Sequence, residues 1–204
     1  TCNGICQINA GGFFNNAPTY GPSSTLIYST GGNFGVGTEW TSNAASGTGV
    51  PNHVQIASGT TLNFGSSNQY RRLLGNLDIS GALALSTASG GDLKIAGNWT
   101  RTGTFTPNNR AVFFDGASGN QSITATGGEI FNYLILDKAS GTVNLANNAT
   151  VNGTAGNTLQ LSNGTITTGA NTLIVSWNDA GAIARTNGYV IGNLAHILAN
   201  LHPS

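Results

Sequence analysis

The residues best suited to acid–base chemistry are few and widely separated. Seven acids occur in 204 residues: Glu39, Asp78, Asp92, Asp115, Glu129, Asp137 and Asp179. Glycoside hydrolysis needs two carboxyl groups facing one cleft, and a calcium-dependent lyase needs clustered acids beside a basic residue. No two acids are adjacent or one residue apart, and the pair considered is Asp78 with Asp92, one coil apart in the fold predicted below. Solvent-facing positions at strand starts explain both acids better, so we predict no catalytic residues and no enzyme.

The three histidines form no recognisable site. His53 follows Pro51 and Asn52 in a predicted turn, and His196 and His202 lie six apart in the C-terminal tail. The chain has no G-x-S-x-G elbow and no glycine-rich phosphate loop that leads into a helix. We therefore expect surface or turn histidines, no cofactor and no metal site.

The two cysteines, Cys2 and Cys6, would close a very small loop if they pair. A reducing cytosol would not keep such a bridge, so a disulfide implies export. Free thiols are the alternative, and a metal site would need a second pair of ligands. The opening residues are polar and unlike a signal peptide, so we expect a mature product or an excised fragment.

The composition excludes several classes of protein. Only 7% of the residues are charged, the formal net charge is zero, and 39% are hydrophobic. Seven scattered basic residues do not make a nucleic-acid footprint, and no apolar run is long enough to span a membrane. Helix-forming residues are scarce, whereas the apolar content argues for a folded core. An all-β protein with many tight turns remains.

Short alternating apolar runs recur from about residue 54. In each run apolar side chains share one face of a predicted strand, as Leu77 and Ile79 do on either side of Asp78. The runs cover residues 54–56, 62–64, 77–79, 83–85, 93–95, 112–114, 134–136, 143–145, 159–161 and 173–175. Their loose spacing of about 14 to 22 residues is typical of stacked coils.

We therefore predict a right-handed parallel β-solenoid with two or three short strands per coil. Asn and Gly would occupy the corners, where Asn side chains bond along the stack. Neutral residues suit positions that repeat every 4.8 Å or so, because stacked like charges repel. An antiparallel sandwich explains the alternation equally well but not the self-similarity.

Four phrases of the sequence carry a family resemblance: residues 37–41 (GTEWT), 91–100 (GDLKIAGNWT), 103–107 (GTFTP) and 185–190 (RTNGYV). They resemble phrases of large secreted repeat proteins of Bacteroidetes-type bacteria. The resemblance covers about residues 17 to 194 and implies a secreted or cell-surface β-solenoid region, usually part of a longer polypeptide. It implies no reaction.

The two ends of the chain are apolar. We divide the chain into an end segment at 1–16, the solenoid at 17–194 and a tail at 195–204 that forms a cap or an exchanged strand. The tail has helical spacing in its apolar residues, which also suits an amphipathic cap. The predicted assembly interface comprises Ile5, Ile8, Phe13 and Phe14 at one end and Leu194, Ile197, Leu198 and Leu201 at the other.

The sequence thus predicts a non-enzymatic, extracellular structural protein that assembles head to tail into a filament or surface layer. Two binding functions are the alternatives. Ice binding would use Thr-x-Thr repeats at 102–106, 124–126 and 165–167. A glycan surface would use the early aromatic residues Phe13, Phe14, Tyr20, Tyr28, Phe34 and Trp40.

Overall fold

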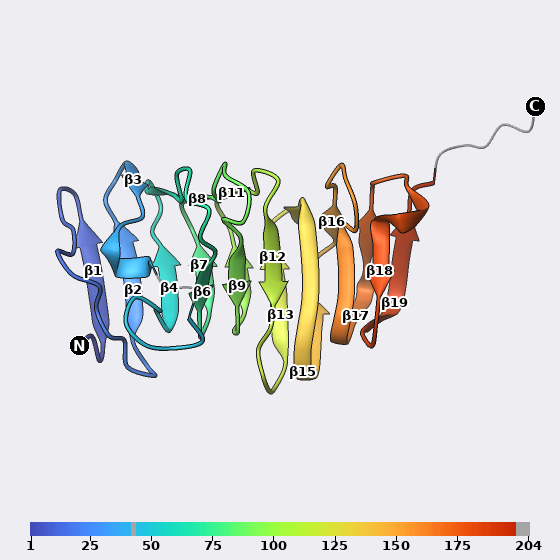
Figure 1. The fold of residues 1–204 in the computed structure, drawn as a ribbon, viewed down its shortest axis with the longest axis horizontal. Helices are drawn as coiled ribbons and strands as arrows, with labels where there is room; N and C mark the ends of the chain where they lie inside the picture. The colour runs from blue at the N-terminus through green and yellow to red at the C-terminus, as the bar shows by residue number, and fades with distance from the viewer. Residues whose placement is uncertain (42–43, 199–204) are drawn as a thin grey trace, which may run out of the picture.

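The chain forms a rod of about nine stacked turns, described for residues 1–41 and 44–198 in a computed structural model. The chain climbs steadily from one end of the rod to the other, so the first and the last described strands lie at opposite ends (Figure 1). Throughout the described residues the named strands pair in parallel, each with its equivalent one turn away. The predicted parallel β-solenoid is confirmed.

The first face of the rod runs its whole length. It contains β1 (Ile5–Asn9), β2 (Thr25–Ser29), β4 (His53–Ile56), β7 (Leu77–Ile79), β10 (Trp99–Arg101) and β13 (Gln121–Ala125). It continues through parts of three longer strands, β15 (Tyr133–Leu145), β17 (Leu159–Val175) and β19 (Tyr189–His196). β15 and β19 each round one corner and join two faces, whereas β17 rounds two corners and joins all three faces.

The second face consists of two stacks that are not hydrogen-bonded to each other. The first stack contains β3 (Asn33–Gly35), β5 (Thr61–Asn63), β8 (Ala82–Ala84) and β11 (Thr104–Thr106). The second contains β14 (Glu129–Phe131), β16 (Ala149–Val151) and the last parts of β17 and β19. We call the interruption between β11 and β14 the break.

The third face begins several turns into the rod. It contains β6 (Arg71–Leu73), β9 (Leu93–Ile95), β12 (Ala111–Phe114), the first parts of β15 and β17, and β18 (Ile183–Arg185). Two short 3-10 helices, η1 (Thr38–Trp40) and η2 (Ala180–Ala182), complete the regular structure.

The turns are longer than predicted. Leu77 pairs with Trp99, 22 residues later, but Ile8 pairs with Tyr28 and Tyr28 with Ile56, which are 20 and 28 residues apart. The shorter spacings in the sequence join strands on different faces, as between β7 and β9. The number of residues in one turn was therefore underestimated, because the chain passes through three faces of the rod in one turn.

Inward side chains form the core by stacking on their equivalents in neighbouring turns. Leu77 and Ile79 are fully buried and Asp78 between them faces outward, as the alternation predicts. Burying one such Leu or Ile contributes about 1.5–3 kcal/mol. The column Leu26, Val54, Leu77, Trp99 and Ile123 runs through the middle of the rod.

Polar ladders bind the corners of neighbouring turns, also as predicted. The backbone N–H of Asn98 donates to Oδ1 of Asn76, and the N–H of Ser122 donates to Oδ1 of Asn98, both at 2.9 Å. His53 begins this ladder, since its Nδ1 accepts from the N–H of Asn76. His53 is therefore a structural corner residue.

The helical alternative for the tail is wrong for the residues described. Leu194 lies in β19, where its strand pairs with β17, and Ile197 follows directly after this strand. The free edge of β17 offers backbone hydrogen bonds that a helix would forgo. Leu201 and His202 lie outside the described residues.

Candidate functional site

The acids considered from sequence do not meet. Asp78 lies on the first face between Gln55 and Thr100 of the neighbouring turns. Asp92 precedes β9 on the third face, where its Oδ1 accepts from the N–H of Ala111 at 2.8 Å. Two carboxyl groups on different faces cannot act on one bond.

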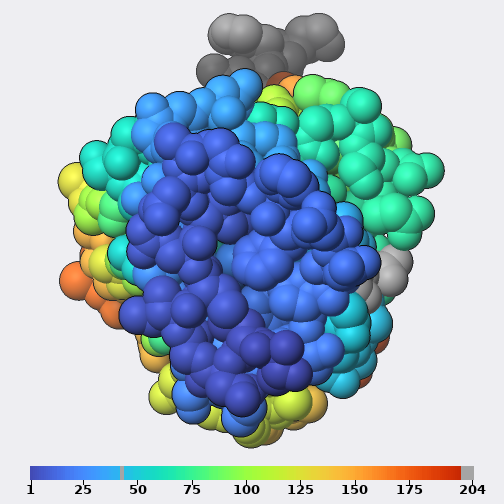
Figure 2. Space-filling view, turned by 90° about the vertical axis from the view of Figure 1, so that its left-hand side faces the viewer, coloured from blue at the N-terminus to red at the C-terminus, as the bar shows by residue number. Residues whose placement is uncertain are grey.

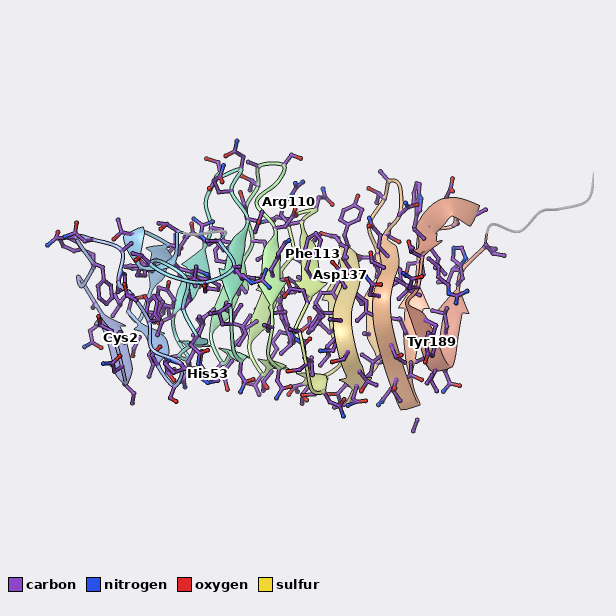
Figure 3. All side chains as sticks on the ribbon, turned by 60° about the horizontal axis from the view of Figure 1, so that its bottom comes forward. Cys2, His53, Arg110, Phe113, Asp137 and Tyr189 are labelled. Carbon is purple, nitrogen blue, oxygen red and sulfur yellow. A yellow bond between two sulfur atoms is a disulfide. The ribbon has the colours of Figure 1, made fainter. Side chains whose placement is uncertain are left out.

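A different pair of acids is brought together, and sequence reasoning missed it. Asp115 and Asp137 follow the paired residues Phe114 and Leu136, so they occupy neighbouring turns of the third face. Asp115 forms a 2.7 Å ion pair with Arg72. We call Arg72, Lys94, Asp115 and Asp137, with the rings of Tyr70 and Phe113, the charged patch. Phe113 and Asp137 are labelled in Figure 3.

Lys94 lies at the centre of the charged patch. Its Nζ is 4.6 Å from the ring centroid of Tyr70 and 4.9 Å from that of Phe113, so two aromatic rings flank one ammonium group. Arg72, Lys94 and Phe113 stand in one column of three successive turns. In a chain with so few charges, this is a marked concentration.

Burial controls the electrostatics of Asp115. Its pKa is raised above the ordinary value because the carboxyl group is desolvated, although Arg72 and Lys94 oppose this shift. Behind it, the buried Nζ of Lys138 donates to the carbonyl of Gly116 and to Oε1 of Gln121, each at 3.0 Å. Burial lowers the pKa of Lys138, and Asp115 opposes that shift.

The accessible parts of the patch suit binding better than acid catalysis. Oδ2 of Asp115 is held by Arg72, and its Oδ1 is buried without a hydrogen-bond partner. Asp137 is exposed and accepts from Nδ2 of Asn163 at 2.8 Å. A general acid must reach its substrate, but Oδ1 of Asp115 is buried and Oδ2 is engaged by the Arg72 guanidinium.

A shallow polar groove of about 290 Å³ lies on the first face. Thr25, His53, Gln55, Asn76, Asp78, Asn98 and Thr100 line it, with Val54 and Leu77. His53, labelled in Figure 3, is held by its ladder bond, and Asp78 accepts from Ser80 Oγ at 2.8 Å. The groove offers hydrogen bonds from four successive turns.

A second groove of about 350 Å³ lies at the break. Here Nε of Arg101 contacts both oxygens of Glu129 at 2.9 and 3.1 Å, and Trp99 Nε1 donates to Glu129 at 2.6 Å. The Arg101 guanidinium also donates to the carbonyls of Gly103 and Gly128. Burial raises the pKa of Glu129, and Arg101 and Trp99 oppose the shift. Every guanidinium nitrogen of Arg101 and both carboxyl oxygens of Glu129 are hydrogen-bonded, and the pair joins two turns.

The early aromatic residues do not form a sugar-binding platform. Tyr28 and Trp40 are fully buried, and Trp40 packs edge-on against Phe64. Tyr28 donates from its hydroxyl to the buried carboxyl group of Glu39 at 3.0 Å. These side chains fill the core of the first turns, so neither Tyr28 nor Trp40 can contact a sugar.

The Thr-x-Thr motifs do not repeat along the stack. Thr165 and Thr167 pair with Thr142 and Asn144 on one side and with Tyr189 and Ile191 on the other. Ice matching needs threonine at the same offset on successive coils, and these turns do not supply it.

The N-terminal end of the rod is a closed turn with two exposed apolar side chains. Figure 2 shows this end covered by the first residues of the chain. A disulfide joins Cys2 to Cys6, and Ile5 and Phe13 are 73% and 71% exposed. Phe14 is half-buried against the core. Ile8 is only 2% exposed because it points inward from β1, so it cannot contact a partner directly.

The C-terminal end presents an open strand edge. Leu194 takes the inward position of the buried Leu173, yet it is 41% exposed because no described turn covers it. Ile197 and Leu198 are also exposed, as are Tyr189 and Ile191, which the sequence analysis did not include. The aromatic and β-branched residues at 189–191 (YVI) favour a strand but do not show that it lies at an edge.

Other sites are not evident in the described residues. Within 1–41 and 44–198, no three His, Cys, Asp or Glu side chains cluster as metal ligands. The same residues include no helix with the length and apolar character to cross a membrane. Comparison with protein families, curated proteins and solved structures finds no match to this chain.

Proposed function

We propose that this protein is an extracellular structural element that assembles end to end into a filament. One observation carries the proposal: exposed apolar side chains gather at the two free strand edges of a rod whose sides are mostly polar. Ile5 and Phe13 lie at one end, and Ile191, Leu194, Ile197 and Leu198 at the other.

The physics of sheet edges supports this assembly. An unpaired edge is a template for another strand, and both free edges, β1 and β19, belong to the same parallel first face. Contact between the two different ends of one chain is heterologous, so it propagates along a line. The Cys2–Cys6 disulfide supports an oxidising, extracellular compartment.

A pair of matched isoleucines tests the proposal. Ile191 and Ile130 are each 51% exposed, but Ile191 lies on the end strand and Ile130 lies on β14 within the rod. We expect the protein and its Ile130→Lys variant to form filaments in negative-stain images and sedimentation. Ile191→Lys should remain monomeric. A monomeric parent at high concentration, or unchanged assembly of Ile191→Lys, would overturn the proposal.

The charged patch favours a second candidate, glycan binding on the third face. Polysaccharides are bound by aromatic rings flanked by hydrogen-bonding charges, and Tyr70, Lys94, Phe113 and Asp137 provide both. Affinity electrophoresis with soluble neutral and uronic-acid polysaccharides would test it on the monomer. Retardation lost in Lys94→Ala but kept in Asn144→Ala, on the first face, would support it. No retardation by any of these polymers would refute it.

A further inference from the structure

One outward column of the first face carries isoleucine at both of its ends. Strand register places the same position of successive turns in line along the rod. Three links lie one residue before the paired strand residues, and a hydrogen bond from a backbone N–H to a side chain confirms each of them. These links join His53 to Asn76, Asn76 to Asn98 and Asn98 to Ser122. The column reads Ile5, Thr25, His53, Asn76, Asn98, Ser122, Asn144, Thr167 and Ile191.

The two isoleucines are the only apolar members of this column. Each internal member lies between two neighbours, and all seven are Asn, His, Ser or Thr residues. The members from His53 to Ser122 are bonded along the stack. Ile5 and Ile191 are instead exposed, at 73% and 51%. An exposed isoleucine at an outward, otherwise polar position lacks a partner within the described rod.

Backbone geometry makes the two edges complementary. β1 and β19 both run in the direction of every other strand of this face, because all its pairings are parallel. A second copy placed on the C-terminal end would therefore offer β1 to β19 in the orientation the rod already uses. Neighbouring strands lie about 4.8 Å apart, so stacked isoleucines would be in contact.

We propose that β19 of one copy pairs in parallel with β1 of the next, in the register that stacks Ile191 directly on Ile5. This inference rests on the proposed end-to-end assembly and adds the partner surface and its register. A shift by one residue would turn inward side chains outward, and a shift by two would place Ile191 against Asn3 or against Gln7. Contact between isoleucines then specifies the register.

Cysteine cross-linking tests the register. In the Ile5→Cys, Ile191→Cys double variant, the two thiols lie at opposite ends of one rod (Figure 1), so any bond between them joins two copies. Under oxidation we expect a ladder of cross-linked oligomers. The matched control is Gln7→Cys with Ile191→Cys, two residues out of register on the same face. It should give about tenfold less ladder, because diagonal neighbours are about 7–8 Å apart.

A charge exchange provides the second test. Ile5→Lys and Ile191→Asp should each prevent filaments, while the double variant should restore them through an ion pair. The Ile5→Lys, Ile191→Lys double variant should form no filaments. In the cross-linking test, an equal or stronger ladder from the Gln7→Cys, Ile191→Cys variant would overturn the register and leave the end-to-end assembly intact. Absence of filaments from the unaltered protein would overturn both.

Discussion

Arg101 shows how one side chain can replace part of a sheet. At the break, β11 and β14 exchange no ladder of backbone hydrogen bonds. The Arg101 guanidinium instead bonds to backbone carbonyls on both sides and to the buried carboxyl group of Glu129. Behind this pair, the rings of Phe105 and Phe131 pack edge to face, with their centroids 6.0 Å apart. Joining of the two stacks thus depends on a charge pair and an aromatic cluster.

Removing Arg101 should be costly. Arg101→Met leaves Glu129 buried and unpaired, which typically costs about 3–5 kcal/mol of unfolding free energy. Arg185→Met is the matched control, since Arg185 is exposed with a single bond to Gly188, and a change within about 0.5 kcal/mol is expected. Urea denaturation followed by circular dichroism measures both. Similar losses for the two variants would contradict this role.

Asp115 should make stability depend on pH. Its folded pKa is raised above 3.8, so the folded state holds the proton more tightly than the unfolded chain does. The resulting stabilisation is present below the unfolded pKa and is lost as pH rises through the folded pKa. Relative to Asp115→Asn, which has no proton to lose, the protein should lose unfolding free energy as the pH rises from the ordinary aspartate pKa of about 4 through the higher folded pKa of Asp115. Urea titrations across that range check the sign, and a relative gain with rising pH would refute it.

The sequence could not reveal the pairing of Asp115 with Asp137 or of Arg101 with Glu129. Each pair is more than twenty residues apart and depends on how many residues the intervening turn contains. Turn lengths vary from 20 to 28 residues, as Ile8, Tyr28 and Ile56 show. Inward and outward positions depend only on local alternation, which is why Leu77, Asp78 and Ile79 were assigned correctly.

At the scale of elements, the corners decide which residues are allowed. Between the first and second faces, Gly103 lies directly over Gly81 of the turn before it. A Cβ at Gly103 would overlap the Gly81 carbonyl oxygen. Short strands can stack closely only if such corners carry no side chain.

Gly103→Ala should therefore destabilise the rod by about 2 kcal/mol or more, the cost of forcing atoms into a packed site. Gly32→Ala is the control because a Cβ there meets nothing within 4 Å and the residue does not need a left-handed conformation. Thermal melting of both variants measures the difference. Equal melting temperatures would show that the corner relaxes without cost.

Most strands were predictable because their apolar residues alternate. The runs at 77–79, 93–95 and 159–161 all lie in strands. The burial of the early aromatic residues was harder to predict. The size and type of a side chain do not show whether Trp40 lies in the core or on a binding surface. Trp40 is buried because its indole N–H donates to the carbonyl of Arg72, a contact across 32 residues.

At the scale of the whole molecule, each turn contacts mainly its neighbours, so the rod behaves as a one-dimensional array. Residues 77–98 are one complete turn, since Leu77 and Trp99 are equivalent. Deleting them should leave a cooperative β fold shortened by about 4.8 Å. Deleting only 77–87 should prevent folding, because the following strands would fall on the wrong faces. Circular dichroism and small-angle scattering distinguish these outcomes, and equal behaviour would contradict the array.

The break also gives the rod a mechanical character. Tension along the axis of the rod pulls neighbouring turns apart. Within the second face, the turns should separate first at the break, where no backbone ladder joins the two stacks. That junction lies between β11 and β14 and is held there by Arg101. Under load the molecule should part there into two stable halves, and single-molecule pulling should show this step at lower force in Arg101→Met.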